Sequence, residues 1–226
     1  MGEFSNRVVL VTGAAGALGS AVVQQFADNG ATVAQLDIVE IENNHYSAIC
    51  DLTNSQSCNT AVANIVDRYE KIDVLANIAG GFTMGTSVYE TSDDTWDFML
   101  GLNARSVLNM ARAVVPTMLP RQSGKIINIG ARAGLRGAPN MAAYSASKSV
   151  VMRLTESLAD ELKAKGINVN AILPSIIDTE RNRQDMPDAD FSKWVSAEAV
   201  ARVVGFLASP AADPIHGALV PVEGLS

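Results

Sequence analysis

The chain has few cysteines, histidines, aromatic residues and charges. Its 226 residues include 2 Cys and 2 His, and 5% are aromatic and 18% charged, whereas about 25% are charged in ordinary soluble domains. The two cysteines, Cys50 and Cys58, could form at most one disulfide bond, which cannot stabilise a chain of this length by itself. This excludes a disulfide-rich scaffold and predicts free thiols. His45 and His216 have no ligand-like neighbours in the sequence, so no metal site is expected.

Long hydrophobic runs and an excess of positive charge are also absent. No apolar run approaches the roughly 18 residues that a membrane-spanning helix needs. Residues 1–7 lack the basic and then apolar layout of a signal peptide. The formal net charge of -7 argues against nucleic acid or an anionic membrane as a partner. We therefore expect a cytoplasmic protein whose partner is a small-molecule substrate.

What the chain does contain is apolar sequence, since 48% of its residues are hydrophobic, which excludes disorder. Short β-branched runs alternate with longer stretches whose apolar residues recur at intervals of three and four. The predicted strands are residues 7–11, 32–36, 47–50, 73–76, 125–129, 168–173 and 218–222. The predicted helices are residues 17–29, 55–69, 94–119, 141–165 and 197–208, the last with Ser196 as its N-cap.

This alternation predicts an α/β fold of the Rossmann type, with a doubly wound, seven-stranded parallel sheet and helices on both of its faces. No repeat, linker or change of composition divides the chain. Residues 1–226 are therefore expected to form a single domain.

A glycine-rich turn, Thr12-Gly-Ala-Ala-Gly-Ala-Leu-Gly19, joins the first predicted strand to the first predicted helix. Such a turn lets the backbone approach a pyrophosphate, and the helix N-terminus adds N–H donors. The second strand is followed by Asp37, where a carboxylate can accept from the adenine ribose and repel a 2′-phosphate. Because no Arg or Lys occurs in the turn or just after Asp37, the pattern favours NAD(H) over NADP(H). The alternatives are a turn without a ligand and a solvated acidic residue.

Tyr144 and Lys148 stand four residues apart near the start of the predicted helix 141–165, and so lie one above the other on one helical face. An ammonium beside a phenol stabilises the phenolate. We therefore expect Lys148 to lower the pKa of Tyr144 from its usual value of about 10. The phenol would then exchange a proton near neutral pH. Such a pair is common by itself and gains weight here from the nucleotide-binding pattern.

These motifs together resemble the short-chain dehydrogenase/reductase family over essentially the whole chain. The resemblance implies an NAD(P)-binding Rossmann domain that transfers hydride to or from nicotinamide, with Tyr144 and Lys148 as the catalytic pair and Asn103 completing the proton relay. It also implies a homodimer or homotetramer. The cofactor-binding positions that it implies are Gly13, Gly16, Ala17, Leu18, Gly19, Asp37, Asp51, Leu52, Asn77, Ala79, Gly80, Tyr144, Lys148, Pro174, Ile177 and Thr179.

Some positions depart from the family pattern. Three smaller departures are Ala17 for a glycine, Ile78 for an asparagine and Ser175 for a glycine. The departure with chemical weight is Ala131, which stands thirteen residues before Tyr144, where the family has a catalytic serine. Loss of one such hydrogen-bond donor costs about 10²–10³ in rate, so ordinary carbonyl reduction is disfavoured.

A branch of the family without this serine, dihydropteridine reductase, reduces quinonoid dihydropterin with NADH, and the chain resembles it locally. The segments that carry the resemblance are residues 16–20, 33–40, 79–82, 130–133 and 174–194. A conjugated ring that spreads negative charge needs no serine donor and can take a proton from Tyr144 directly. A short, open substrate loop is expected at about residues 179–196, where Trp194 could stack on a flat ring or belong to the core.

Three functions therefore stay open. The first is NADH-dependent reduction of a conjugated planar substrate such as a quinonoid dihydropterin or a quinone. The second is a general carbonyl reductase or alcohol dehydrogenase of the 3-oxoacyl reductase type, and the third is a low-turnover NAD(H)-binding regulatory or scaffold subunit. Arg132 either replaces part of the lost donor or is a surface arginine. The helix faces expected to pack between subunits include Met110, Ala111, Val114 and Met118.

Overall fold

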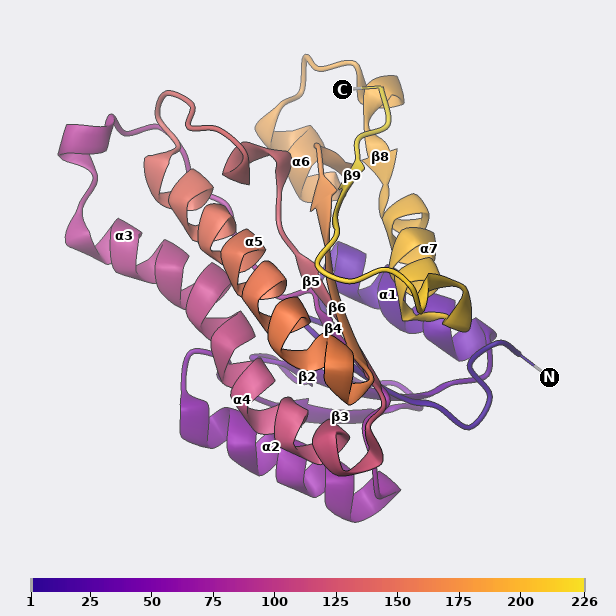
Figure 1. Cartoon of the computed structure of the whole chain (residues 1–226). Coiled ribbons are helices and arrows are strands. Elements are labelled where there is room, and N and C mark those ends of the chain that lie inside the picture. Colours follow the sequence, from indigo (N-terminus) through magenta and orange to yellow (C-terminus); the bar gives the residue numbers. More distant parts are fainter. Residues whose placement is uncertain (1, 226) are drawn as a thin grey trace.

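The computed structural model describes residues 2–225 and shows a seven-stranded sheet between two layers of helices (Figure 1). The strands pair in parallel in the order β3-β2-β1-β4-β5-β6-β9. They are β1 Val8–Thr12, β2 Thr32–Asp37, β3 Tyr46–Ile49, β4 Val74–Asn77, β5 Gly124–Ile129, β6 Ile167–Pro174 and β9 Leu219–Val222. The predicted doubly wound α/β fold is confirmed, and each predicted strand lies within one residue of its observed bounds.

The helices form a layer on each face of the sheet (Figure 1). One layer holds α1 (Ala17–Asp28) and α7 (Ala197–Ala208), and the other holds α2 (Ser55–Tyr69), α4 (Ser106–Met118) and α5 (Ala142–Leu162). The shorter elements are α3 Asp93–Met99, α6 Glu180–Asp185, β7 Ile177–Asp178, β8 Val195–Ser196, η1 Val88–Glu90, η2 Leu100–Arg105, η3 Leu119–Arg121, η4 Arg132–Gly134, η5 Lys163–Lys165, η6 Phe191–Lys193 and η7 Pro210–Ala212. Within residues 2–225, no helix combines the length and apolarity that crossing a membrane requires.

The central strands are buried on both faces. Val9 and Val11 of β1 lie in the core with Phe26 of α1. Leu10, between them, lies with Met110 of α4 in the core on the opposite face. Two-sided burial of this kind explains why continuous apolar runs, rather than strict alternation, predicted these strands correctly.

The predicted helix 94–119 is interrupted. α3 runs into η2, which is a π-helical segment, before α4 begins at Ser106. π-helical turns are rare and are frequent at functional sites. The prediction of one continuous helix is therefore wrong here, because a single extra residue in a turn leaves the apolar spacing almost unchanged.

The ends of two other helices follow local signals. Ser196 is the N-cap of α7, as predicted, because its Oγ accepts a hydrogen bond from Ala199 N at 3.1 Å. α5 ends at Leu162, earlier than the predicted residue 165, and the 3₁₀ turn η5 follows it. Gly166 closes that turn with φ of 72°, a backbone region that favours glycine.

The side chains expected to pack between subunits lie inside the chain. Met110, Val114 and Met118 are fully buried in the core beneath the sheet, and Ala111 is 4% exposed. The prediction that these residues form an outer face is wrong. The spacing of apolar residues shows that a helix has an apolar face, but not whether that face packs against the sheet or against a second subunit. The homo-oligomer stays a prediction.

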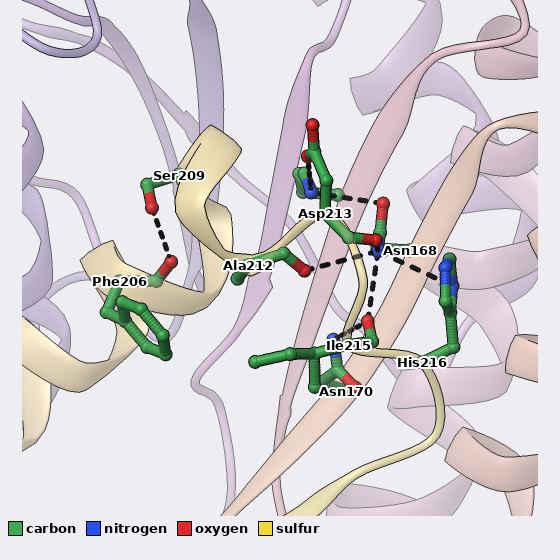
Figure 2. Close-up of polar contacts among 9 residues, drawn as sticks. Asn168, Asn170, Phe206, Ser209, Ala212, Asp213, Ile215 and His216 are labelled. Carbon is green, nitrogen blue, oxygen red and sulfur yellow. Dashed lines mark hydrogen bonds and ion pairs between the residues drawn. The ribbon is translucent and has the colours of Figure 1, made fainter.

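Two asparagines of β6 hold the loop that leads into β9, as Figure 2 shows. Asn168 Nδ2 donates to the carbonyl oxygens of Asp213 at 2.8 Å and Ile215 at 2.9 Å. Asn170 Nδ2 donates to the same Ile215 oxygen at 2.9 Å. These bonds seat β9 beside β6, so the residues that follow β9 arrive at the same sheet edge as the ends of β5 and β6.

Candidate active site

The predicted site residues come from distant parts of the chain and meet at one edge of the sheet. Because the strands are parallel, the residues that follow β1, β2, β4, β5 and β6 lie together at its carboxyl edge. β1 lies between β2 and β4, where the strand order reverses, and α/β proteins bind ligands outside such a point. Tyr144 and Lys148 reach this edge from the first turns of α5.

The turn between β1 and α1 is shaped to hold an anion. Gly13 has φ of +65°, and a Cβ there would lie 2.7 Å from Ala79 Cα. A Cβ on Gly19 would lie 2.0 Å from Gly13 O. Within the described chain no side chain caps α1 at Gly16, and its first turn, which begins at Ala17, has no acidic residue. The N–H donors and partial positive charge of the helix N-terminus therefore fit a dinucleotide pyrophosphate.

Asp37 ties the end of β2 to this turn. Its Oδ2 accepts from Ala15 N at 2.9 Å and its Oδ1 from Ile38 N at 2.7 Å. A hollow of about 490 Å³ opens between Ala15 and the loop after β2, and Glu40 and Glu42 are among its lining residues. The acidic surroundings suit ribose hydroxyls and oppose an added phosphate group.

Thr12 organises the main chain after β4. Its Oγ1 accepts from Ile78 N at 3.1 Å and from Ala79 N at 3.2 Å. The sequence placed Thr12 at the start of the glycine-rich turn but did not show that its side chain binds the main chain after β4. Asn77 is 3% exposed, and its Nδ2 donates to Asn128 Oδ1 at 2.8 Å. The Asn77 side chain therefore lies within the sheet layer rather than in the open cleft.

The predicted adenine and nicotinamide contacts lie at loop positions of this edge. Asp51 is exposed, with Oδ1 accepting from Thr53 N at 2.9 Å, while the Leu52 side chain is 5% exposed. Thr179 Oγ1 accepts from Asn182 N at 3.2 Å and caps α6. The remaining predicted contacts in this part of the chain are Pro174, which ends β6, and Ile177, which begins β7.

Lys148 is buried, and Tyr144 is partly buried. Lys148 is 4% exposed, and its Nζ donates to Ile129 O at 2.8 Å. Burial lowers the pKa of Lys148 to about 8 and raises the pKa of Tyr144 to about 12. The predicted lowering of the Tyr144 pKa is therefore wrong in this structure, because burial dominates and the ammonium binds a main-chain carbonyl. Tyr144 therefore holds its proton at neutral pH.

Asn103 lies in η2 and is 1% exposed. Its Oδ1 accepts from Gly81 N at 2.9 Å, and its Nδ2 donates to Gly81 O at 3.1 Å and Ser147 Oγ at 2.9 Å. A Cβ on Gly80 would lie 2.8 Å from Asn103 Oδ1 and 3.2 Å from Lys148 Nζ. The structure thus brings Asn103, Lys148 and Gly80 together.

An aromatic ring packs against the phenol of Tyr144. The rings of Phe82 and Tyr144 meet edge to face, with centroids 4.8 Å apart and an interplanar angle of 84°. Phe82 stays 54% exposed. Ala131 is 5% exposed and follows β5 in an extended conformation. Sequence reasoning gave Phe82 no role of its own, although an exposed aromatic residue after a Gly-Gly pair was an available signal.

Arg132 and the substrate loop are held by local pairs. Arg132 Nε lies 2.8 Å from Glu223 Oε1, which joins the ends of β5 and β9. In the loop at residues 179–196, Arg183 makes two bonds to Asp178, at 2.6 and 2.7 Å. The rings of Phe191 and Trp194 lie 4.8 Å apart, so Trp194 packs within the loop and is half-buried.

Metal-ligating and thiol groups do not add to the site. Across residues 2–225, no group of three His, Cys, Asp or Glu side chains is placed to hold a metal ion. Cys50 and Cys58 are buried free thiols, as predicted.

Comparison with known proteins agrees with this geometry. The short chain dehydrogenase family profile matches residues 7–190. The 3-oxoacyl-[acyl-carrier-protein] reductase FabG of Thermotoga maritima is 30% identical over 242 residues, which cover 98% of each chain. Dehydrogenase/reductase SDR family member 6 of Rattus norvegicus is 32% identical over 246 residues, covering 99% of this chain and 98% of the relative.

A solved structure described as "Crystal structure of gox2181" matches with a TM-score of 0.92 and 30% identity, over 98% of this chain and 95% of that one. The match extends over the sheet, both helix layers and the carboxyl edge where the site residues meet. The chain belongs to the short-chain dehydrogenase family and is an NAD(P)(H)-dependent oxidoreductase.

Proposed function

We propose that this protein is an NADH-dependent reductase of a conjugated planar compound, such as a quinonoid dihydropterin or a quinone. Bound NADH supplies the hydride. Tyr144 donates the proton, Lys148 holds the nicotinamide ribose and stabilises negative charge on the phenol, and Asn103 completes the relay that returns a proton to Tyr144.

We assign the whole chain to a single NAD(P)-binding domain. Its cofactor-binding residues lie along the carboxyl edge of the sheet. The turn at residues 13–19 holds the pyrophosphate, Asp37 the adenine ribose, and Asp51 with Leu52 the adenine. The main chain at residues 79–80 and the segment at residues 174–179, with Thr179 at its end, flank the nicotinamide.

The observation that carries the proposal is the methyl group of Ala131, thirteen residues before Tyr144 in the sequence, together with a Tyr144 that holds its proton. A ketone that receives hydride gathers charge on one oxygen, which a second donor normally stabilises. Ala131 offers only a methyl group, whereas Tyr144, with a pKa of about 12, is a donor over the whole physiological range. A conjugated ring spreads the charge, so one phenol donor is enough. The exposed Phe82 offers such a ring an aromatic surface for packing.

The substrate class is tested by following NADH oxidation with quinonoid dihydropterin, a quinone and a panel of ketones. The wild type should reduce the first two and leave ketones largely unreacted. Tyr144→Phe should lose at least about 10²-fold in kcat, because the proton donor is gone. Ala131→Ser should gain about 10²-fold in ketone reduction, because it restores an oxyanion donor, while reduction of the planar substrates stays within about twofold.

Other outcomes of this experiment favour the competing functions. A 3-oxoacyl thioester belongs in the panel, because the Thermotoga maritima relative is described as a 3-oxoacyl-[acyl-carrier-protein] reductase. Reduction of that thioester or of ketones by the wild type, with no pterin or quinone reduction, would contradict the proposal. NADH binding without any turnover would instead support a regulatory or scaffold subunit, although Tyr144, Lys148 and Asn103 are all retained.

The preference for NADH is tested at Asp37. Asp37→Asn keeps the size of the side chain and removes the charge that opposes a 2′-phosphate. The dissociation constant for NADPH, measured by fluorescence titration, should fall about tenfold, while that for NADH rises severalfold. Glu42→Gln removes the same charge from the wall of the neighbouring hollow and should change both constants less. Tighter wild-type binding of NADPH than of NADH would overturn the preference.

A further inference from the structure

We propose that Ser147 is a positioning residue, which orients the amide of Asn103 and through it holds the main chain at Gly80 and Gly81 beside Lys148. This inference rests on the proposed function, because it concerns residues assigned there to the proton relay. Ser147 lies on α5 directly before Lys148 and is fully buried.

The Ser147 hydroxyl makes two hydrogen bonds whose directions are set. It donates to Tyr144 O at 2.7 Å and accepts from Asn103 Nδ2 at 2.9 Å. A hydroxyl has one proton, and the main-chain carbonyl of Tyr144 takes it. Asn103 must therefore present its NH₂ group, and not its oxygen, to Ser147. The serine thus favours the same amide orientation of Asn103 that the main chain of Gly81 favours.

The selected orientation determines what Asn103 does to the neighbouring main chain. With Nδ2 directed to Ser147, Oδ1 is free to accept from Gly81 N at 2.9 Å, and Nδ2 also reaches Gly81 O at 3.1 Å. Both main-chain groups of Gly81 are therefore satisfied by one side chain. The same amide oxygen and Lys148 Nζ lie against Gly80, where a Cβ would approach them to 2.8 and 3.2 Å.

Three segments meet at this point: the main chain after β4, the π-helical segment η2 and the catalytic helix α5. Without the Ser147 hydroxyl, the buried amide of Asn103 loses its bond to α5. The two bonds to Gly81 then hold the amide alone, so Asn103 and the main chain at Gly81 are less firmly positioned against α5. Water gains access to Lys148, whose pKa then rises towards its ordinary value.

The test compares Ser147→Ala with Ser145→Ala. Ser145 lies on the same helix and is buried, but within the described residues its hydroxyl has no hydrogen-bond partner. NADH affinity is measured by fluorescence titration at a series of pH values from 6 to 10. The pH is varied because the Lys148 ammonium is assigned to bind the nicotinamide ribose, so its loss of charge should weaken binding. Wild-type affinity should fall as the pH rises through about 8, where Lys148 loses its charge.

Ser147→Ala should weaken NADH binding about tenfold at neutral pH and move the midpoint of the pH profile upward. It should also lower kcat for quinone reduction more than it changes the KM of the quinone. Ser145→Ala should stay within about twofold of wild type in each measurement. Ser147→Thr keeps a hydroxyl that can bond to the same helical turn and should restore most of the affinity.

An unchanged pH midpoint in Ser147→Ala would overturn the inference, whatever the variant does to stability in urea. The result is separable from the proposed function, since NADH binding does not depend on the substrate. If Tyr144→Phe retains full quinone reduction, the proposed proton donor is wrong, while the binding data still decide whether Ser147 positions Asn103.

Discussion

At the scale of single residues, the buried charge of Lys148 lowers the stability of the fold and serves the proposed function. Its ammonium is buried with a single main-chain acceptor among the described hydrogen bonds. The pKa consequently falls from 10.5 to about 8. Since one pKa unit corresponds to about 1.4 kcal/mol, the folded protein disfavours the charged form by about 3 kcal/mol. Under the proposed function this cation is retained because it serves the cofactor and the phenol.

Lys148→Met should therefore stabilise the protein while it abolishes catalysis. At pH 7 the free energy of unfolding should rise by about 2 kcal/mol, since a buried charge is removed and one hydrogen bond is lost. Between about pH 8 and 10.5, Lys148 is protonated in the unfolded wild-type chain but largely neutral in the folded one. The stability of the wild type therefore increases with pH over this range. The difference in unfolding free energy between Lys148→Met and the wild type should narrow accordingly.

Urea unfolding at pH 7 and pH 10 measures this difference. Lys165→Met, at an exposed position of η5, is the matched control and should change stability little at either pH. A Lys148→Met variant that is less stable than wild type at pH 7 would show that the ammonium is better compensated than its surroundings indicate.

At the scale of elements, the site depends on segments that are held by side chains rather than by regular pairing. η2 carries Asn103 in a π-helical turn that is bound to the main chain of Gly81 and to Ser147. At the other edge of the sheet, Asn168 of β6 binds the carbonyls of Asp213 and Ile215 and so forms the loop before β9. In both places one buried asparagine replaces several backbone hydrogen bonds.

Asn168→Ala should destabilise the fold by about 2–3 kcal/mol, because the part-buried carbonyls of Asp213 and Ile215 lose a donor. The loss should be local first, with faster amide exchange in residues 209–218 than in β4 or β5. Hydrogen exchange followed by mass spectrometry measures both effects. Asn44→Ala, at an exposed position, is the control and should leave exchange in that loop at the wild-type rate.

At the scale of the whole molecule, the two edges of the sheet have different roles. The carboxyl edge carries the candidate site. At the amino edge, Asp73 binds residues from several segments of the chain. This buried carboxylate accepts from Val8 N at 2.8 Å, Lys71 Nζ at 2.9 Å and Arg121 Nη1 at 2.9 Å. Burial by itself would raise the pKa of Asp73, but these bonds outweigh it and hold the pKa below its usual value.

Asp73→Asn should cost about 2 kcal/mol of stability at pH 7, because bonds from Lys71 and Arg121 lose their charged acceptor. The Asp73 contribution is fully present above its unfolded pKa of about 3.9 and is lost as the pH falls through the lower folded pKa. The gap between wild type and variant should therefore close in acid, as urea unfolding at pH 7 and pH 3 would show. Asp160→Asn, which alters an exposed ion pair with Lys163, should show no comparable gap.

The bounds of the strands were predictable within one residue, because strands that are buried on both faces consist of short, continuous apolar runs. The candidate site was partly predictable for the same reason. Gly13, Asp37 and Tyr144 follow short-range patterns, and parallel strands bring such patterns to one edge. The hydrogen bonds of the Thr12 and Ser147 side chains were not predictable, because each joins a partner far away in the chain.

Local spacing along the chain was enough to predict the order of the elements and the parallel sheet. It was also enough to locate the glycine turn, Asp37, Tyr144 and Lys148. The packing of the folded chain set the direction in which the Tyr144 pKa shifts, because it withdraws part of the phenol from water. It also decided that Met110 packs inward and that Asn103 lies in a π-helical turn. Burial and hydrogen bonds between distant residues set these properties, and no short stretch of sequence records them.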